Sequence, residues 1–480
     1  NLRQTMDKGE PEAFFVYDTL TREKQRVFAE DGATLRFYCC GPTVYGPAHI
    51  GNFRTFIAQD LFRRVAECSG MKTMHVRNVT DVDDKTIRDS RAAGKRLDEF
   101  TSEWRAFFEK DCKSLGLLKP HEEPSAVAHI PQQIKMIEDL FSSEHAYLAE
   151  DGSVYFRISS FENYGRLSGL DKREVRTASS GETMDRDEYS KEDLRDFALW
   201  KARREEDGEN FWNSPWGEGR PGWHLECSAM CREYLGDSFD MHSGGEDLVF
   251  PHHENEIAQS ECSTGKAFAR HWFHIAHLMV DGGKMSKSLN NMYTLSDLQA
   301  KGFVPEAIRY LLLSGHYRQS LNFTLSSLDA ASGALAKLKK FDESLGADRP
   351  ADYSESVARG PTELGPFEDS WKSLLDDLNS PKALGELFGA IREINLDPLS
   401  FEEKTRIRDS FWFILHAFGL KLASKDQIVE PPKDVKELAE SRMEARKLKD
   451  WGRADELREQ IAEKGWTIKD LSDGYELAQA

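Results

Sequence analysis

Four residues far apart in the chain carry side chains that could bind one metal ion. They are Cys40, Cys227, His252 and Glu256. The last two are four residues apart, so on a helix they would share one face and could hold the same ion. Thiolate, imidazole and carboxylate together suit Zn²⁺ in tetrahedral geometry. Neighbouring residues could replace members of this set: Cys39, Cys231, His242 and His253. The ordinary alternative is that the cysteines are small core residues and that His252 and Glu256 form a surface pair.

Two further segments could bind phosphate. His49-Ile50-Gly51-Asn52 opens a predicted helix just after a strand and a turn, and the amides of a helix N-terminus attract anions. The segment 281–288 (DGGKMSKS) combines two glycines with Lys284 and Lys287, which could clamp an anion. Its spacing is not that of a Walker loop, so an ordinary P-loop ATPase is excluded. Read alone, the first segment is a helix start with a polar first turn, and the second is an exposed basic turn.

Four cations near the C-terminus are spaced four, three and four residues apart: Arg442, Arg446, Lys449 and Arg453. On one helix they would form a basic stripe suited to a phosphate backbone. Acidic neighbours such as Glu444 and Asp450 dilute this charge. The alternative is a solvated helix face.

The elements that must position these residues begin with a predicted strand at Thr34–Cys40, an alternating stretch that is rich in aromatic residues. From His49 to Gly70, apolar residues recur every three or four positions, which predicts a helix. A second strand is predicted at Thr73–Val79. Strand, glycine turn, helix and strand form the first unit of a parallel α/β sheet.

The pattern along the rest of the chain predicts an α/β fold with several parts. A Rossmann-like, parallel-sheet catalytic domain carries an insertion and is followed by an α-helical bundle and a small C-terminal domain. The expected ranges are 1–145 and 216–278 for the two catalytic halves, 146–215 for the insertion, 279–312 for the lysine loop region, 313–424 for the bundle and 433–480 for the terminal domain. A polar loop is expected at Leu345–Pro366 and a linker at Glu430-Pro431-Pro432. In the terminal domain, Val435–Glu463 should be helical and Trp466–Leu471 should form a strand.

The composition limits the class of protein. A net charge of −19 over 480 residues argues against a protein that coats nucleic acid nonspecifically, although a local basic face could still bind RNA. No apolar run approaches the roughly 18 residues of a membrane helix, so no membrane partner is expected. The residues after Asn1 lack the basic-then-apolar order of a secretory signal. Seven dilute cysteines then indicate reduced thiols in the cytoplasm.

Together these segments resemble the cysteinyl-tRNA synthetase family of class I. Matching blocks follow the family's order along nearly the whole chain: YCCGPTVYGPAHIGNFR at 38–54, NVTDVDDK at 78–85, GWHLECSAM at 222–230, GGEDLVFPHHENEIAQ at 244–259 and KMSKS at 284–288. The segment EARKLKDWGRADELREQI at 444–461 is similar to the family's terminal domain. Two positions depart from the pattern. Asn52 stands where histidine is more familiar in the HIGH-type motif, and Asn290 stands where glycine is usual. Asparagine can still donate to a phosphate oxygen, but it carries no charge.

The resemblance implies a role for each matching residue. One zinc ion would be held by Cys40, Cys227, His252 and Glu256, with Cys40 rather than Cys39 as the ligand. Catalysis is assigned to His49, Asn52, Lys284 and Lys287, ATP binding to Gly51, Asp247 and Lys287, and cysteine binding to Gly41, Thr43, Trp223 and His224. For Asp247 the alternative is a helix cap, and for Trp223 and His224 it is core packing. The helical bundle and the terminal domain would form the end that reads the anticodon.

The implied reaction activates cysteine with ATP, which brings Mg²⁺, and transfers it to the terminal adenosine of tRNA. Zinc would select the substrate thiolate, because serine differs by one atom and packing alone discriminates only about 10–200-fold. The expected partners are tRNA(Cys), ATP and L-cysteine, and the chain is expected to act as a monomer.

Two other functions share parts of this pattern. One is a cysteine ligase that uses the same core but transfers cysteine to an amino sugar, as in mycothiol synthesis. The segment after Pro432 favours tRNA as the acceptor, since a small acceptor molecule needs no separate domain that binds it far from the active site. The other is a synthetase-like protein that binds tRNA or zinc without catalysis. The intact lysines and zinc candidates argue against it, and Asn52 is the one feature in its favour.

Overall fold

Four parallel strands form the central sheet of the computed structural model, in the order β12-β11-β3-β4. They are β3 (Thr34–Cys39), β4 (Lys72–Arg77), β11 (Phe239–Gly245) and β12 (Ala269–Ile275). The structure describes residues 12–170, 183–184, 186–191, 194–285, 291–346, 363–422, 432–471 and 474–479. The predicted α/β fold is confirmed, and the predicted first strand, helix and second strand agree with β3, α1 and β4 to within about two residues at each end.

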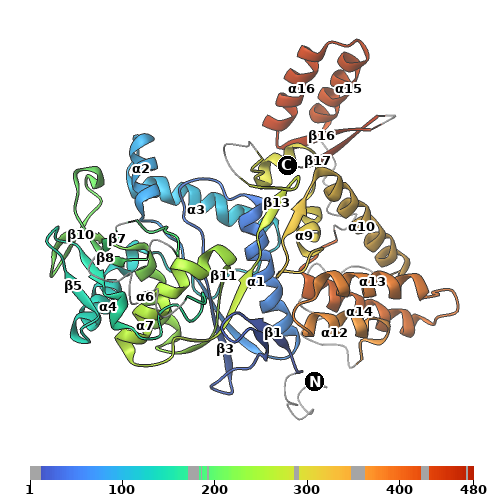
Figure 1. Ribbon diagram of the computed structural model, residues 1–480. Helices are drawn as coiled ribbons and strands as arrows, with labels where there is room; N and C mark the ends of the chain where they lie inside the picture. Colours follow the sequence, from blue (N-terminus) through green and yellow to red (C-terminus); the bar gives the residue numbers. More distant parts are fainter. Residues whose placement is uncertain are drawn as a thin grey trace.

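Helices cover both faces of this sheet (Figure 1). Helix α1 (Ile50–Cys68) joins β3 to β4 and packs on one face, while α6 (Trp223–Leu235) and α7 (Glu254–Thr264) pack on the other. Successive residues of a strand point to opposite faces. Cys39 therefore belongs to the core under α1, and Cys40 to the core that contains Cys227. The strand geometry thus places the two adjacent cysteines on opposite faces of the sheet.

The insertion is a second, mostly antiparallel sheet. Three helices precede it: α2 (Asp84–Ala92), α3 (Leu97–Ser114) and α4 (Ile130–Ser142). Its strands are β5 (Ala146–Leu148), β6 (Val154–Phe156), β7 (Thr183–Met184), β8 (Asp196–Ala202), β9 (Trp212–Ser214) and β10 (Gly217–Pro221). Because β10 pairs with β8, the insertion extends through Pro221. The predicted boundary at 215/216 is therefore too early, and the parallel domain resumes with α6.

A small three-stranded sheet connects the catalytic domain to the helical bundle. It consists of β13 (Leu278–Val280), β14 (Gly283–Lys284) and β15 (Leu321–Phe323), with α8 (Leu295–Ala300) and α9 (Pro305–Leu313) between β14 and β15. The bundle helices are α10 (Leu325–Ser344), α12 (Glu368–Leu375), α13 (Ser380–Glu393) and α14 (Phe401–Phe418). Their buried residues share one core with α1 and α9. Most of the loop predicted at Leu345–Pro366, and Glu430-Pro431 of the predicted linker, lie outside the described residues.

The C-terminal unit is a helix hairpin with a β-ribbon. It contains α15 (Lys433–Lys447), α16 (Trp451–Glu463), β16 (Trp466–Leu471) and β17 (Gly474–Gln479). The predicted strand at Trp466–Leu471 is confirmed, and the range Val435–Glu463, predicted to be helical, forms two helices joined by a short turn. The chain turns between the helices, where Lys449 has a φ of 60° and Asp450 caps α16. At the other end of the chain, β1 (Phe15–Asp18) and β2 (Glu23–Arg26) form a hairpin.

None of the helices in the described part of the chain has the length and apolar character that a bilayer crossing requires.

Candidate active site

The four residues predicted to bind metal meet behind the C-terminal end of β3. Cys40 directly follows β3, Cys227 lies on α6, and Glu256 is in the first turn of α7. One potential ligand atom from each of the four, His252 included, lies within 4.8 Å of the others, and all four residues are buried. The Nε2 atom of His252 is 3.0 Å from Oε1 of Glu256. Two thiols, an imidazole and a carboxylate at these separations fit a tetrahedral zinc site.

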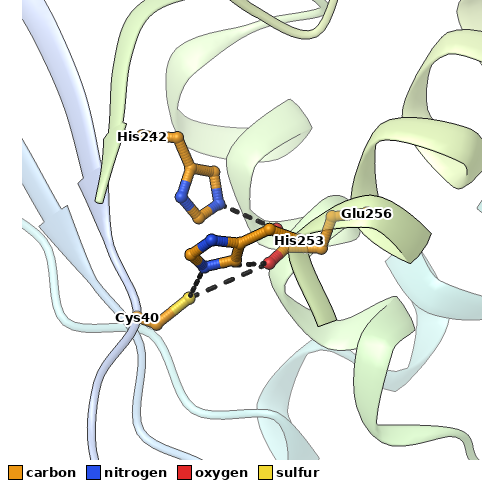
Figure 2. A group of neighbouring side chains, drawn as sticks. All are labelled: Cys40, His242, His253 and Glu256. Atoms are coloured by element: carbon orange, nitrogen blue, oxygen red, sulfur yellow. Dashed lines mark hydrogen bonds and ion pairs between the residues drawn. The ribbon is translucent and has the colours of Figure 1, made fainter. Parts of the chain in front are cut away.

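A second group of four overlaps with the first. Figure 2 shows Cys40 and Glu256 together with His242 and His253, and these four also offer ligand atoms within 4.8 Å of one another. Sγ of Cys40 is 3.3 Å from Nε2 of His253, and Nε2 of His242 is 2.9 Å from Oε2 of Glu256. The proximity of these atoms therefore does not by itself choose between the groups.

The neighbouring cavity distinguishes the two groups of potential metal ligands. A cavity of about 660 Å³ is lined by Cys40, Cys227 and His252, but not by His242 or His253. A site that handles a substrate needs an open coordination position. Three members of the first group line the space where a substrate can lie, whereas the second group reaches it only through the shared Cys40. On the far side, Nδ1 of His253 instead contacts Nε2 of His274 at 2.7 Å.

The charges in the first group are set by its own members and by the neighbouring His242. Burial raises the pKa of the Cys227 thiol, but hydrogen bonds with Cys40 and His252 outweigh burial and lower that pKa to about 6. Burial lowers the pKa of His252, yet attraction to Glu256 raises it to about 10. Glu256 has a pKa lowered to about 2, because attraction to His242 and His252 exceeds the effect of burial. At neutral pH the group therefore contains a Cys227 thiolate, a Glu256 carboxylate and a protonated His252, and metal binding would release the proton of His252.

Most of the predicted nucleotide and cysteine residues line the same cavity. Besides the metal-facing residues, its lining includes Gly41, Thr43, His49, Asn52, Trp223 and Asp247. Four predicted residues are absent from the lining that the described residues form: Gly51, His224, Lys284 and Lys287. His224 is buried behind the wall, with its Nδ1 3.0 Å from Nδ1 of His252, so it contacts a metal candidate and not the cavity. Lys287 lies outside the described residues.

The turn before α1 explains the asparagine at position 52. His49 is the N-cap of α1, and its Nδ1 accepts from the backbone N–H of Asn52 at 3.3 Å. In return, Oδ1 of Asn52 accepts from the backbone N–H of His49 at 3.0 Å. This is a capping box, which fixes the first turn of the helix. The oxygen of the amide is used in the cap, and its NH₂ group remains the donor that could meet a phosphate.

The lysine loop begins beside this turn. A Cβ added at Gly51 would lie 3.0 Å from Nδ1 of His49 and 3.1 Å from Sδ of Met285, which adjoins Lys284. After the loop, the carbonyl of Tyr293 accepts from the N–H of Ile50 at 2.9 Å. The two predicted phosphate segments, more than 230 residues apart in the chain, are therefore neighbours in space.

Two glycines of the cavity wall have close neighbours: the neighbour of Gly41 is backbone and requires glycine, while that of Gly245 is a side chain. A Cβ at Gly41 would lie 1.7 Å from the backbone oxygen of Asn78, and one at Gly245 would lie 2.3 Å from Oδ1 of Asp247. Asp247 follows β11 within the short 3₁₀ turn Glu246–Leu248, whose N-cap Gly245 has no side chain that could cap it. The structure therefore gives Asp247 a place on the cavity wall and no capping bond in that turn.

Sequence reasoning missed some residues of the cavity. The lining also includes Lys85, Asn78 and Thr80, all within the block 78–85 that follows β4. The side chains of Asn78 and Thr80 both donate to Glu226 of α6. The position of this block directly after a strand of the parallel sheet was the available signal, because the carboxyl ends of such strands meet at one edge.

The predicted basic stripe does not form. Arg442 is buried, with its Nη1 2.6 Å from Oδ1 of Asp470, and Arg446 approaches Oδ2 of the same carboxylate at 2.8 Å. Lys449 lies in the turn between the helices, and Arg453 on α16 pairs with Glu456 at 2.8 Å. The stripe was wrong because it assumed one continuous helix. Of the four cations, Arg442 is the one that is buried in the folded protein.

Comparisons with known proteins agree with this geometry. The family described as tRNA synthetases class I (C), catalytic domain, matches residues 27–333. A cysteine–tRNA ligase of Opitutus terrae is 49% identical over 98% of this chain and 99% of that protein. One of Chlamydia muridarum is 45% identical over 96% and 99%. Among solved structures, the methionyl-tRNA synthetase of Mycobacterium tuberculosis in complex with methionyl-adenylate covers 80% of this chain and 90% of its own, with a TM-score of 0.54 and 12% identity, which shows a shared fold.

Proposed function

The chain belongs to the family of cysteine–tRNA ligases, and from this premise we propose that its cavity activates cysteine with ATP and transfers it to tRNA(Cys), with zinc held by Cys40, Cys227, His252 and Glu256. One observation carries the proposal. Three of the four metal candidates (Cys40, Cys227 and His252), the turn at the start of α1 and Asp247 all border one cavity. The substrate sulfur, carboxylate and nucleotide could therefore be held together.

The metal would supply a soft Lewis acid that binds a thiolate far better than a serine hydroxyl. The protein's part is to hold and orient the ligands. His224 contacts Nδ1 of His252 at 3.0 Å, which leaves Nε2 of His252 for the metal. The ring of Trp223 stacks on that of His252 with centroids 4.2 Å apart, which fixes the plane of the imidazole. Together with Gly41 and Thr43, Trp223 would border the bound cysteine.

ATP would lie across the C-terminal edge of the sheet. His49, Gly51 and Asn52 at the N-terminus of α1 would hold phosphate oxygens, and Asp247 would accept from the ribose hydroxyls. Lys284 and Lys287 would neutralise the leaving pyrophosphate, together with Mg²⁺ bound to ATP. Phosphoryl chemistry of this kind depends on positioning and charge neutralisation and needs no covalent nucleophile.

The reaction would proceed in two balanced steps. The cysteine carboxylate attacks the α-phosphorus of ATP, a new O–P bond forms, and the bond to pyrophosphate breaks. A ribose hydroxyl of the terminal adenosine of tRNA then attacks the adenylate carbonyl. The ester forms, AMP leaves with the electron pair of the broken C–O bond, and the hydroxyl proton passes to solvent. The helical bundle and the C-terminal unit would bind the remainder of the tRNA, and we expect a monomer acting in the cytoplasm.

The first experiment is cysteine-dependent ATP–pyrophosphate exchange, with serine as the competing substrate, before and after removal of the metal with a chelator. We expect exchange with cysteine only, loss of exchange on metal removal and recovery when Zn²⁺ is restored. Charging of tRNA(Cys) then tests the second step. A folded, zinc-loaded protein that catalyses no exchange would overturn the proposal.

A further inference from the structure

Lys85 is the one lysine or arginine among the described residues that line the cavity. The acidic residues of the same lining are Asp89, Glu188 and Asp247. The second substrate of the proposed reaction is a polyanion, and the whole chain carries a net charge of −19. A nucleic acid strand that enters this cavity therefore meets negative charge on its walls and needs a local counter-charge.

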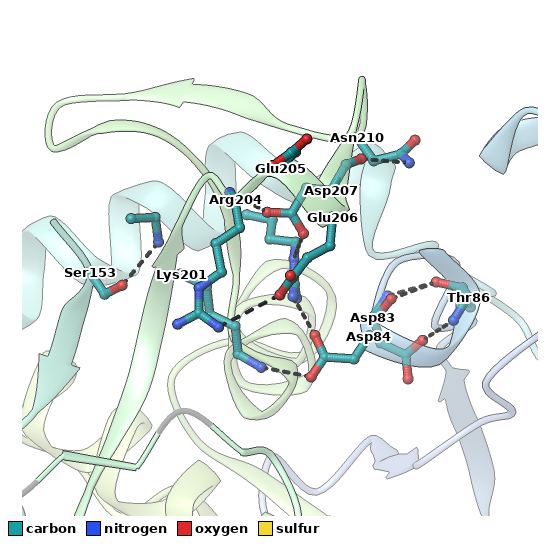
Figure 3. Close-up of polar contacts among 12 residues, drawn as sticks. Asp83, Asp84, Thr86, Ser153, Lys201, Arg204, Glu205, Glu206, Asp207 and Asn210 are labelled. Carbon is teal, nitrogen blue, oxygen red and sulfur yellow. Dashed lines mark hydrogen bonds and ion pairs between the residues drawn. The ribbon is translucent and has the colours of Figure 1, made fainter. Parts of the chain in front are cut away.

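The backbone of Lys85 is held firmly. Asp83 caps α2 through a reciprocal pair of hydrogen bonds with Thr86, and Lys85 lies between them. Next to it, Asp84 accepts from the buried Lys201 at 3.1 Å and from Arg220. Figure 3 shows both anchors, the Asp83–Thr86 cap and the Asp84–Lys201 pair. The first turn of α2 is thus fixed to the insertion on one side and capped on the other.

The side chain of Lys85 has only weak contacts. It is 40% exposed, and its Nζ lies 2.7 Å from Oε1 of Glu188, a carboxylate that is itself 68% exposed. The ring of Tyr45 lies beneath the amine, with Nζ 5.8 Å from the ring centroid. Exposed ion pairs of this kind add little net stability. A phosphate could therefore replace Glu188 as the partner at small cost.

The sheet order places Lys85 across the cysteine site from the nucleotide side. Asp247 follows β11 and the segment of Lys85 follows β4, while β3, which ends at the metal candidate Cys40, lies between these two strands. The 3′ end of a tRNA that enters on the β4 side would therefore approach the carbonyl of the cysteinyl adenylate from the side opposite the ribose of ATP. In Figure 1, α2 and the α15–α16 hairpin both rise on the upper side of the view, where a bound tRNA would extend.

We propose that Lys85 is a positioning residue for the second step: its ammonium group leaves Glu188 and binds a phosphate of the 3′-terminal nucleotides of tRNA, which places the terminal ribose at the cysteinyl adenylate. This inference rests on the proposed function. It assigns Lys85 to the transfer step and not to activation, because the activation residues lie at α1, at Asp247 and at the lysine loop.

The test replaces Lys85 with methionine, which retains the length of the side chain without its charge, in the full-length, zinc-loaded protein. We expect pyrophosphate exchange to stay within about 2-fold of wild type. Charging of tRNA(Cys) should fall on the order of 10- to 100-fold, as expected for loss of one charge-assisted hydrogen bond. Lys85→Arg should recover most of the charging, and Glu188→Gln should retain or improve it.

A matched control is Lys266→Met. Lys266 forms a similar exposed pair with Asp237, at 2.8 Å, and does not line the cavity. It should leave both steps unchanged. The salt dependence gives a readout that a structural defect would not reproduce. The slope of log KM for tRNA against log salt should decrease by about 0.7 in Lys85→Met, the value for one phosphate contact to a single strand.

Each other outcome overturns the inference. Equal losses in exchange and charging would place Lys85 at the phosphates of ATP, and unchanged charging would mean that it binds no substrate. If the wild-type protein catalysed no exchange, the proposed function itself would fail, and the role of Lys85 with it. Thermal unfolding of each variant separates these results from misfolding.

Discussion

The imidazole of His252 and the carboxylate of Glu256 face each other, with Nε2 of His252 3.0 Å from Oε1 of Glu256. This contact brings together the segment Val249–His253, which is kinked at Phe250, and the first turn of α7. Both side chains are fully buried, so the pair does not behave as an exposed surface pair. Its position beside two cysteines and a cavity makes it the centre of the proposed zinc site.

Replacement of Cys227 by serine should reduce bound zinc from about one ion per chain to well under half. The hydroxyl of serine is a poor ligand at neutral pH, and three remaining ligands hold zinc more weakly. The measurement is metal per chain by mass spectrometry after dialysis. Cys231→Ser is the matched control, because Cys231 lies one turn further along α6, is equally buried and belongs to neither candidate group.

The same measurement distinguishes the two overlapping groups. If Cys40, Cys227, His252 and Glu256 bind the ion, His253→Asn should retain zinc, since His253 belongs only to the second group. Loss of zinc in His253→Asn together with retention in Cys227→Ser would assign the ion to the second group.

Gly41→Ala should destabilise the fold and abolish pyrophosphate exchange. The added methyl group would lie 1.7 Å from the backbone oxygen of Asn78, so the cavity wall must move. Overpacking of this kind costs about 1–3 kcal/mol or more. Urea unfolding measures the loss. Gly46→Ala in the same loop is the control, because a Cβ there meets nothing within 4 Å. Equal stability of both variants would contradict the close approach at Gly41.

Asp60→Asn should destabilise the contact between the catalytic domain and the bundle by about 3–5 kcal/mol, because it leaves two buried cations without their partner. Asp60 on α1 pairs with Arg64 and with Arg309 of α9. Arg309 also donates to the carbonyl of Phe418 at the end of α14, at 2.9 Å. Thermal and urea unfolding measure the effect, and Asp98→Asn, in an exposed pair with Arg96, is the control.

The same carboxylate predicts how stability depends on pH. Burial alone would raise the pKa of Asp60, but attraction to Arg64 and Arg309 holds it well below its ordinary value. Because the pKa is lower in the folded protein, the pair stabilises the fold fully above the unfolded pKa of about 4 and is lost as pH falls below it. We expect the wild-type unfolding free energy to fall more steeply than that of Asp60→Asn below about pH 4. Parallel curves would contradict this.

The sequence predicted those features that depend on local periodicity or on family blocks. The spacing of His252 and Glu256 indicated a shared face, and the family blocks indicated Cys40 rather than Cys39. What it could not provide depended on contacts between distant segments. The spacing of the residues alone left His253 as an alternative to His252, which the position of the cavity disfavours, and Lys85 carried no periodic signal of its own.

The C-terminal unit shows the same limit. The apolar and basic spacing across Val435–Glu463 is compatible with one helix, and the turn residues Leu448–Asp450 include no glycine or proline, although Gly452 follows closely. The left-handed backbone of Lys449 interrupts that helix, with a φ of 60°. Arg442 forms an ion pair with Asp470, which lies on β16, 28 residues further along the chain. Secondary-structure propensities alone indicate neither the turn at Lys449 nor the ion pair between Arg442 and Asp470.

The turn between α15 and α16 leads to the last prediction, which concerns tRNA binding. Trp451 is 57% exposed at the start of α16, and Leu448 beside it is 76% exposed. The guanidinium of Arg446 lies 5.7 Å from the centroid of the Trp451 ring. An exposed aromatic ring next to cations suits stacking on an unpaired base, which contributes about 1–3 kcal/mol.

Trp451→Ala should therefore raise KM for tRNA(Cys) about 5- to 150-fold and leave pyrophosphate exchange unchanged. Phe401→Ala removes a 78% exposed aromatic side chain from the bundle and serves as the control. If both variants charge tRNA with the wild-type KM, the tip of the hairpin does not contact the nucleic acid, and the contacts must lie on another face of the C-terminal unit or on the bundle.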